Sequence, residues 1–157
     1  MDFDHRLVRR RAIPGLTDTH THLIRGGMSF NMELRWDGVP SLGDALRMLK
    51  EQARRNPPPQ WVRVVGGWSE FQFAERRMPT LAELNAAAPD TPVFILHLYD
   101  RARLNRAALR AVGYTKDTPE RPGGAIERDK RGDPTGDARC PAERHDPLQD
   151  AGAGTEA

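Results

Sequence analysis

The stretch IPGLTDTHTHL, residues 13–23, is the part of the sequence that carries recognisable chemistry. Successive side chains of a strand point to opposite faces, so in an extended chain His20 and His22 share one face with Asp18. Neutral imidazoles are good ligands for zinc and other divalent ions, and a ligating histidine usually donates its other ring N–H to a carboxylate. His20 and His22 are therefore candidate metal ligands, and Asp18 is a candidate acceptor for one of their ring N–H groups. The alternative is a solvated pair of histidines that binds no metal.

The same residues resemble a family signature. Ile-Pro-Gly-Leu-Thr-Asp-Thr-His-Thr-His-Leu is similar to the first-strand signature of the amidohydrolase superfamily. The longer stretch from residue 11 to residue 136 resembles family 3 of that superfamily, in which a long inserted segment follows the His-x-His strand. The resemblance implies a (β/α)8 TIM barrel and metal-dependent hydrolysis of carbon–nitrogen bonds other than peptide bonds. It further implies a divalent metal ion, expected to be Zn2+, and a small amide or cyclic-amide substrate.

A Gly-Gly-Trp segment, residues 66–68, recurs in the inserted region of the resembled branch, where it approaches the active site. The resemblance therefore implies that Trp68 and Glu70 line the substrate site. The alternative from the residues alone is an interface tryptophan next to a solvated glutamate.

The chain has 157 residues, whereas a (β/α)8 barrel needs about 250. We therefore expect an α/β fold that is an incomplete barrel: the first barrel strand plus the inserted α/β segment. The expected parts are a short stub over 1–12, the amidohydrolase portion over 13–136, and a tail over 137–157. The family takes further metal ligands from later strands, which this sequence does not show. A second hypothesis therefore stands: an inactive, non-catalytic fragment, or a subunit that needs a partner chain to complete the barrel.

The tail over 137–157 changes character abruptly. It is acidic, it is rich in alanine and glycine without a period, and Leu148 is its one large aliphatic residue. Such a composition cannot form a core, so we expect disorder. Since arginine greatly outnumbers lysine in the chain, as in high-GC coding, a shifted reading frame is a further hypothesis for the tail.

Composition and charge bear on partners and compartment. The formal net charge is +2, and no run of basic residues alternates with aromatic ones, so we predict no nucleic-acid binding. No window approaches 18 consecutive apolar residues, so we predict no membrane span. The single cysteine, Cys140, excludes an intramolecular disulfide and fits a reducing compartment. We expect a cytoplasmic protein.

Hydrophobic spacing predicts an alternation of helices and strands between residues 41 and 136. Ser41 and Thr80 are predicted N-caps, and the prolines at 57–59 are predicted to stop the first helix. Helices are predicted over 42–53, 81–88 and 104–112, a strand that enters a loop over 61–65, a buried strand over 93–99, and a hairpin over 125–136. His97 lies inside the second of those strands. It is either a metal ligand that converges with His20 and His22 or, the favoured alternative, a hydrogen-bonded core group.

Overall fold

The computed structural model describes residues 15, 17, 18, 24, 27, 30, 32–98, 101–120 and 123–139. The chain divides into two compact units, Met1–Phe30 and Asn31–Ala157. In the first unit Asp18 is exposed and belongs to neither a helix nor a strand, whereas His20, His22 and the predicted stub over 1–12 lie outside the described residues. The helices and strands whose bounds are described belong to the second unit.

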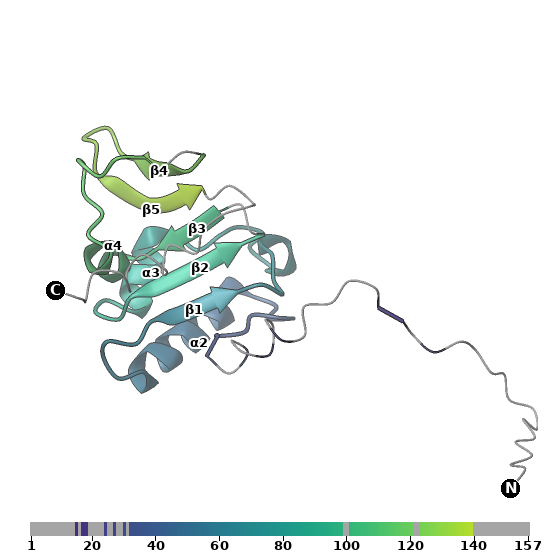
Figure 1. The fold of residues 1–157 in the computed structure, drawn as a ribbon. Coiled ribbons are helices and arrows are strands. Elements are labelled where there is room, and N and C mark those ends of the chain that lie inside the picture. The colour runs from purple at the N-terminus through teal and green to yellow at the C-terminus, as the bar shows by residue number, and fades with distance from the viewer. Residues whose placement is uncertain are drawn as a thin grey trace, which may run out of the picture. The chain divides into compact units, whose positions relative to one another are not determined.

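The second unit is built on a mixed five-stranded sheet with helices packed against it (Figure 1). The strands lie in the order β1-β2-β3-β5-β4; β1 and β2 are parallel, and the other neighbours are antiparallel. The elements in chain order are α2 (Leu42–Arg55), β1 (Val62–Val65), the 3-10 helix η1 (Glu70–Gln72), α3 (Leu81–Ala87), β2 (Val93–His97), β3 (Arg101–Leu104), α4 (Arg106–Ala111), β4 (Ala125–Arg128) and β5 (Pro134–Arg139). The predicted α/β class is confirmed.

Helix α2 begins where the sequence predicts and ends at Arg55, two residues later than predicted. The Ser41 hydroxyl accepts a hydrogen bond from the backbone N–H of Asp44 at 3.1 Å, which satisfies one of the free donors of the first turn. Leu42, Ala45 and Leu49 are buried at helical spacing. The helix ends two residues before the proline run, because proline cannot continue the backbone hydrogen bonding.

Helix α3 begins with the predicted capping box. The Thr80 hydroxyl accepts from the backbone N–H of Glu83 at 3.2 Å, and the Glu83 carboxylate accepts from the backbone N–H of Thr80 at 2.7 Å. The guanidinium of Arg77 beside that carboxylate and the bonds from Thr80 outweigh partial burial and lower the pKa of Glu83 to about 2. This helix start is therefore fixed by charge as well as by hydrogen bonds.

Strand β2 lies inside the sheet, between β1 and β3, and is buried on both faces. On one face Val93 and Ile95 join the larger core cluster, to which α2 and α3 contribute. On the other face Phe94 packs with residues of β3 and α4. A strand covered on both faces reads as a continuous apolar run, which is why the sequence predicts it. Among the described helices, none is both long and apolar enough to cross a membrane.

The predicted helix over 104–112 is wrong at its start. Residues 101–104 form β3, which pairs antiparallel with β2 through Phe94 opposite Leu104 and His97 opposite Arg101. Helix α4 begins only at Arg106. A strand of only four residues is too short to be recognised by its alternation, and its pairing with β2 determines its conformation.

Asn105 joins the elements around the start of α4. It is fully buried, and its side-chain oxygen accepts from the backbone N–H groups of Val93 at 3.0 Å and Ala108 at 2.9 Å. Its side-chain nitrogen donates to the carbonyls of Ala88 at 2.7 Å and Thr91 at 2.9 Å. One amide therefore caps α4 and ties it to the end of α3 and the start of β2.

The predicted hairpin is confirmed as β4 and β5. Strand β5 continues to Arg139 and so takes in the first three residues of the predicted tail, residues 137–139. Within that extension the carboxylate of Asp137 accepts two hydrogen bonds from Arg103 of β3, at 2.5 and 2.8 Å. Residues 140–157, where disorder and a shifted frame were predicted, lie outside the described residues.

Candidate functional site

The predicted substrate-lining residues Trp68 and Glu70 follow strand β1, at the end of the sheet where the parallel strand β2 also ends. Gly66-Gly67-Trp68 follows β1, and Leu98 follows β2. The two strands point the same way, so these segments lie at the same end of the sheet (Figure 1). Ligand sites of α/β sheets form at the carboxyl ends of parallel strands. We call the residues 66–72 and 97–98 the β1–β2 edge.

Gly67 lets the chain turn sharply at this edge. Its φ is +68°, and a Cβ atom there would collide with the carboxylate of Asp37. That carboxylate is itself held by two hydrogen bonds of 2.9 Å from Arg35. Only glycine fits this close approach, and the turn directs the following Trp68 side chain into the core.

Trp68 lies in an aromatic cluster below the edge. Its side chain is 5% exposed and contacts Trp36 edge-on at 5.0 Å between ring centroids, Phe73 in a stacked arrangement at 5.7 Å, and His97 at 5.5 Å. Such aromatic pairs add to the stability gained from burial alone. Trp68 is therefore a core residue rather than the interface tryptophan of the alternative.

Glu70 and His97 form the central polar pair of the edge. Glu70 Oε2 lies 2.5 Å from His97 Nε2, so Glu70 is paired rather than solvated. The Glu70 side chain is 16% exposed and that of His97 only 3%. Burial alone would raise the pKa of Glu70, but hydrogen bonds from its own backbone N–H and from His97, with the charges of His97 and Arg101, lower it overall. Glu70 is therefore a carboxylate at neutral pH.

His97 is thus seen as the hydrogen-bonded core group that the sequence favoured. Among the residues that the structure describes, no group of three or more histidine, cysteine, aspartate or glutamate side chains is arranged to hold a metal ion. The predicted ligands His20 and His22 are outside those residues, so the structure neither assembles nor separates them.

Sequence reasoning singled out Glu70 and His97 separately but missed their pairing, because they are 27 positions apart in the chain. The sequence did contain a signal for the pairing. Glu70 follows one strand, His97 ends the next, and a helix connects the two strands. Such a connection predicts that the strands are parallel neighbours whose carboxyl ends are adjacent.

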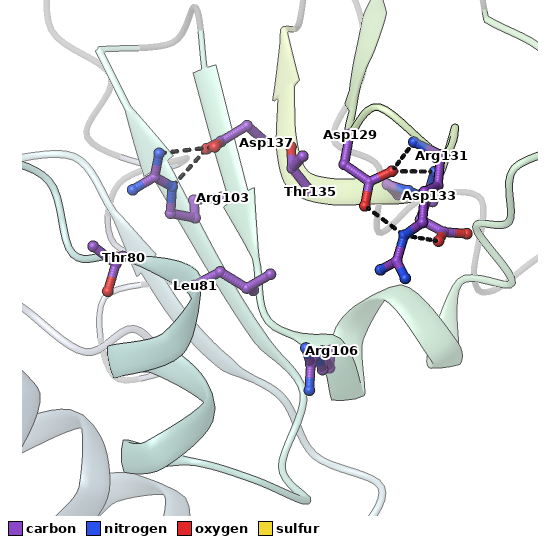
Figure 2. Close-up of a pocket in the computed structure, with 10 residues that line it drawn as sticks. Thr80, Leu81, Arg103, Arg106, Asp129, Arg131, Asp133, Thr135 and Asp137 are labelled. Carbon is purple, nitrogen blue, oxygen red and sulfur yellow. Dashed lines mark hydrogen bonds and ion pairs between the residues drawn. The ribbon is translucent and has the colours of Figure 1, made fainter.

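A second candidate is the cavity between α3, β3, α4 and the β4–β5 turn (Figure 2). It has a volume of about 590 Å3 and is lined largely by arginine and aspartate. Most of these charges are already paired: Arg103 binds Asp137 and the Pro79 carbonyl, and Arg131 lies 3.6 Å from Asp129. The Arg103–Asp137 pair therefore holds β5 against β3. Because most charged groups of the cavity are already paired, few of them are available to bind a ligand.

Comparison with known proteins gives a consistent family. A model described as "Amidohydrolase family" matches residues 10–141. YtcJ of Bacillus subtilis (strain 168), an amidohydrolase by name, is 36% identical over 124 residues, 78% of this chain and 23% of that protein. The N-substituted formamide deformylase of Arthrobacter pascens is 35% identical over 129 residues, 81% of this chain and 24% of that protein. The chain thus spans about a quarter of these relatives.

Solved structures agree in fold. A metal-dependent hydrolase from Pyrococcus horikoshii OT3 superposes with a TM-score of 0.50 at 25% identity, over 87% of this chain and 23% of the other. A metal-dependent hydrolase from Pyrococcus furiosus gives 0.51 at 22% identity, over 89% and 24%. The family match covers most of the chain and includes the His-x-His stretch. The chain belongs to the amidohydrolase family.

Proposed function

We propose that this chain is part of a metal-dependent hydrolase that cleaves carbon–nitrogen bonds other than peptide bonds. The observation that carries the proposal is the family match over residues 10–141, which takes in His20 and His22. The deformylase among the relatives acts, by its name, on N-substituted formamides, which contain such a bond. Small amides or cyclic amides are the proposed substrates.

His20 and His22 are the proposed metal ligands, and Asp18 is the proposed acceptor for a ring N–H. The donor set fits a borderline divalent ion, and Zn2+ is the proposed one, because two imidazoles and a nearby carboxylate suit it. Such an ion, when bound, supplies Lewis-acid polarisation and a water of lowered pKa. The proposed setting is the open end of a (β/α)8 barrel, whose other strands would supply the remaining ligands.

Glu70 and Trp68 are the proposed substrate-lining residues. Glu70 is the partly exposed carboxylate of the β1–β2 edge, and Trp68 packs in the aromatic cluster below it. We propose that the protein is cytoplasmic and that it binds neither nucleic acid nor a membrane. A partner chain that completes the barrel belongs to the second candidate, a non-catalytic or partner-dependent fragment.

The test is hydrolysis by the full 157-residue chain loaded with Zn2+. N-benzylformamide and hydantoin would be assayed beside His22→Ala, with His5→Ala as the control for loss of a histidine outside the motif. If the chain itself carries the activity, it turns over at least one substrate and loses about a hundredfold or more of that rate in His22→Ala alone. Equal turnover in all three proteins would contradict the assignment, and no turnover in any would favour the non-catalytic fragment.

A further inference from the structure

We propose that Glu70 determines substrate specificity at the β1–β2 edge by accepting a hydrogen bond from a nitrogen-bearing group next to an apolar substituent, and that His97 positions it. This inference rests on the C–N hydrolase function proposed above, and it adds the class of ligand that the edge recognises. The ligand is an N-substituted amide, or the ammonium product released from it.

The geometry divides the roles of the two residues. His97 is 2% exposed, so it cannot reach a ligand and can act only through Glu70. Its ring nitrogen holds Glu70 Oε2 at 2.5 Å, which fixes the orientation of the carboxylate. A carboxylate offers about four lone-pair sites, so the bonds from His97 and from the backbone N–H of Glu70 itself leave part of its acceptor capacity. Because the Glu70 side chain is also partly exposed, we infer that it is a pre-oriented acceptor.

The charge of Glu70 selects the chemistry of its ligand. An ionised carboxylate only accepts hydrogen bonds, so it favours N–H groups and above all ammonium ions, and it repels anions. Hydrolysis of an N-substituted amide releases an amine, which is protonated at neutral pH. Such a carboxylate would therefore bind the N–H of the substrate and the ammonium group of the product in preference to a neutral alcohol of the same shape.

Exposed apolar residues follow both members of the pair in the chain. Phe71 follows Glu70 and is 65% exposed, and Leu98 follows His97 and is 61% exposed. Leu98 also has a φ of +45°, a strained conformation for a branched residue. Strain of this kind persists where the surrounding structure holds it and gathers at ligand sites. We infer that Phe71, the residue next to Glu70 in the chain, offers exposed apolar surface to an aromatic or aliphatic substituent on the ligand nitrogen.

The test is direct binding to the full chain without added metal, so that it does not depend on turnover. Benzylammonium chloride and benzyl alcohol would be titrated in 1H–15N NMR, with Glu70→Gln as the variant. Glu51→Gln, which replaces an exposed glutamate of α2, is the matched control. We expect benzylammonium to shift the resonances of residues 66–72 and 98, and its Kd to rise about tenfold in Glu70→Gln only.

Two His97 variants separate positioning from packing. His97→Gln keeps an N–H donor for Glu70, whereas His97→Phe keeps the aromatic volume and removes the donor. We expect the preference for benzylammonium over benzyl alcohol to survive in the first and fall in the second, with folding checked by circular dichroism. The inference is overturned if wild type does not bind benzylammonium, if Glu70→Gln binds it equally well, or if the shifts map elsewhere. Loss of turnover with binding intact would instead count against the hydrolase function alone.

Discussion

Replacing Asn105 with aspartate changes one nitrogen to one oxygen at a fully buried position. The remaining oxygen still accepts from the backbone N–H groups of Val93 and Ala108, so the cap of α4 is preserved. The lost nitrogen donated to the carbonyls of Ala88 and Thr91. In Asn105→Asp those two carbonyl oxygens would face a carboxylate oxygen instead of a donor.

Each of the two lost hydrogen bonds leaves a buried acceptor unsatisfied, at about 1–3 kcal/mol. We therefore expect a loss of about 4 kcal/mol at pH 7, a large part of the 5–15 kcal/mol that is typical of a domain. The two carbonyls also raise the pKa of the new carboxyl above its unfolded value of about 3.9. Since a raised pKa penalises the ionised form, the loss is complete above the folded pKa and shrinks as pH falls from that pKa towards the unfolded value.

The assay is urea unfolding at pH 7 and pH 5, followed by tryptophan fluorescence. Asn85→Asp makes the same chemical change at a less buried position, where the side-chain oxygen accepts from the backbone N–H of Arg106 at 2.9 Å. That control is expected to stay within about 0.5 kcal/mol of wild type. A loss below about 1 kcal/mol in Asn105→Asp, or one that is the same at both pH values, would refute the reasoning.

Two further variants test the loops and caps. Glu83→Gln should lower the free energy of unfolding by about 1 kcal/mol at neutral pH. Because the folded pKa of Glu83 is about 2 against an ordinary 4.5, the difference from wild type in thermal unfolding should vanish as pH falls from 4.5 to 2. A difference that does not change with pH would contradict this prediction. Gly67→Ala should cost about 3 kcal/mol in urea unfolding, because its Cβ would collide with Asp37. Gly38→Ala has the same φ of +68° and open space, so it should cost only about 1 kcal/mol, and equal losses would mean that the contact with Asp37 is unimportant.

Elements with local signals could be predicted from the sequence. Helices α2 and α3 carry their own caps at Ser41 and Thr80, and the apolar run of β2 needs no knowledge of its neighbours. Their bounds follow because side chains and backbone within one turn decide them. The β4–β5 hairpin belongs to the same group.

Elements that depend on distant partners could not be predicted. Strand β3 exists because β2 offers it a hydrogen-bonding edge, and its own four residues carry almost no signal. Asp137 reads as the first residue of an acidic tail until Arg103, 34 residues earlier, is placed opposite it. Long-range pairing of this kind is invisible to periodicity and capping rules.

In the candidate site too, the sequence identified single residues but not the long-range contact between them. Glu70 and Trp68 were found by family resemblance, but the bond from His97 that orients the carboxylate needed the parallel pairing of β1 and β2. The assignment of His20 and His22 rests on sequence alone and stays a prediction.

The most direct test of the proposed metal-dependent hydrolase is the metal content of the full chain. Wild type, a double variant with His20→Ala and His22→Ala, and the control His5→Ala would be equilibrated with Zn2+, freed of excess metal by gel filtration, and measured by mass spectrometry of the elements. We predict that wild type and the control retain Zn2+ and that the double variant loses it. Zinc retained at the wild-type level by the double variant would contradict the assignment.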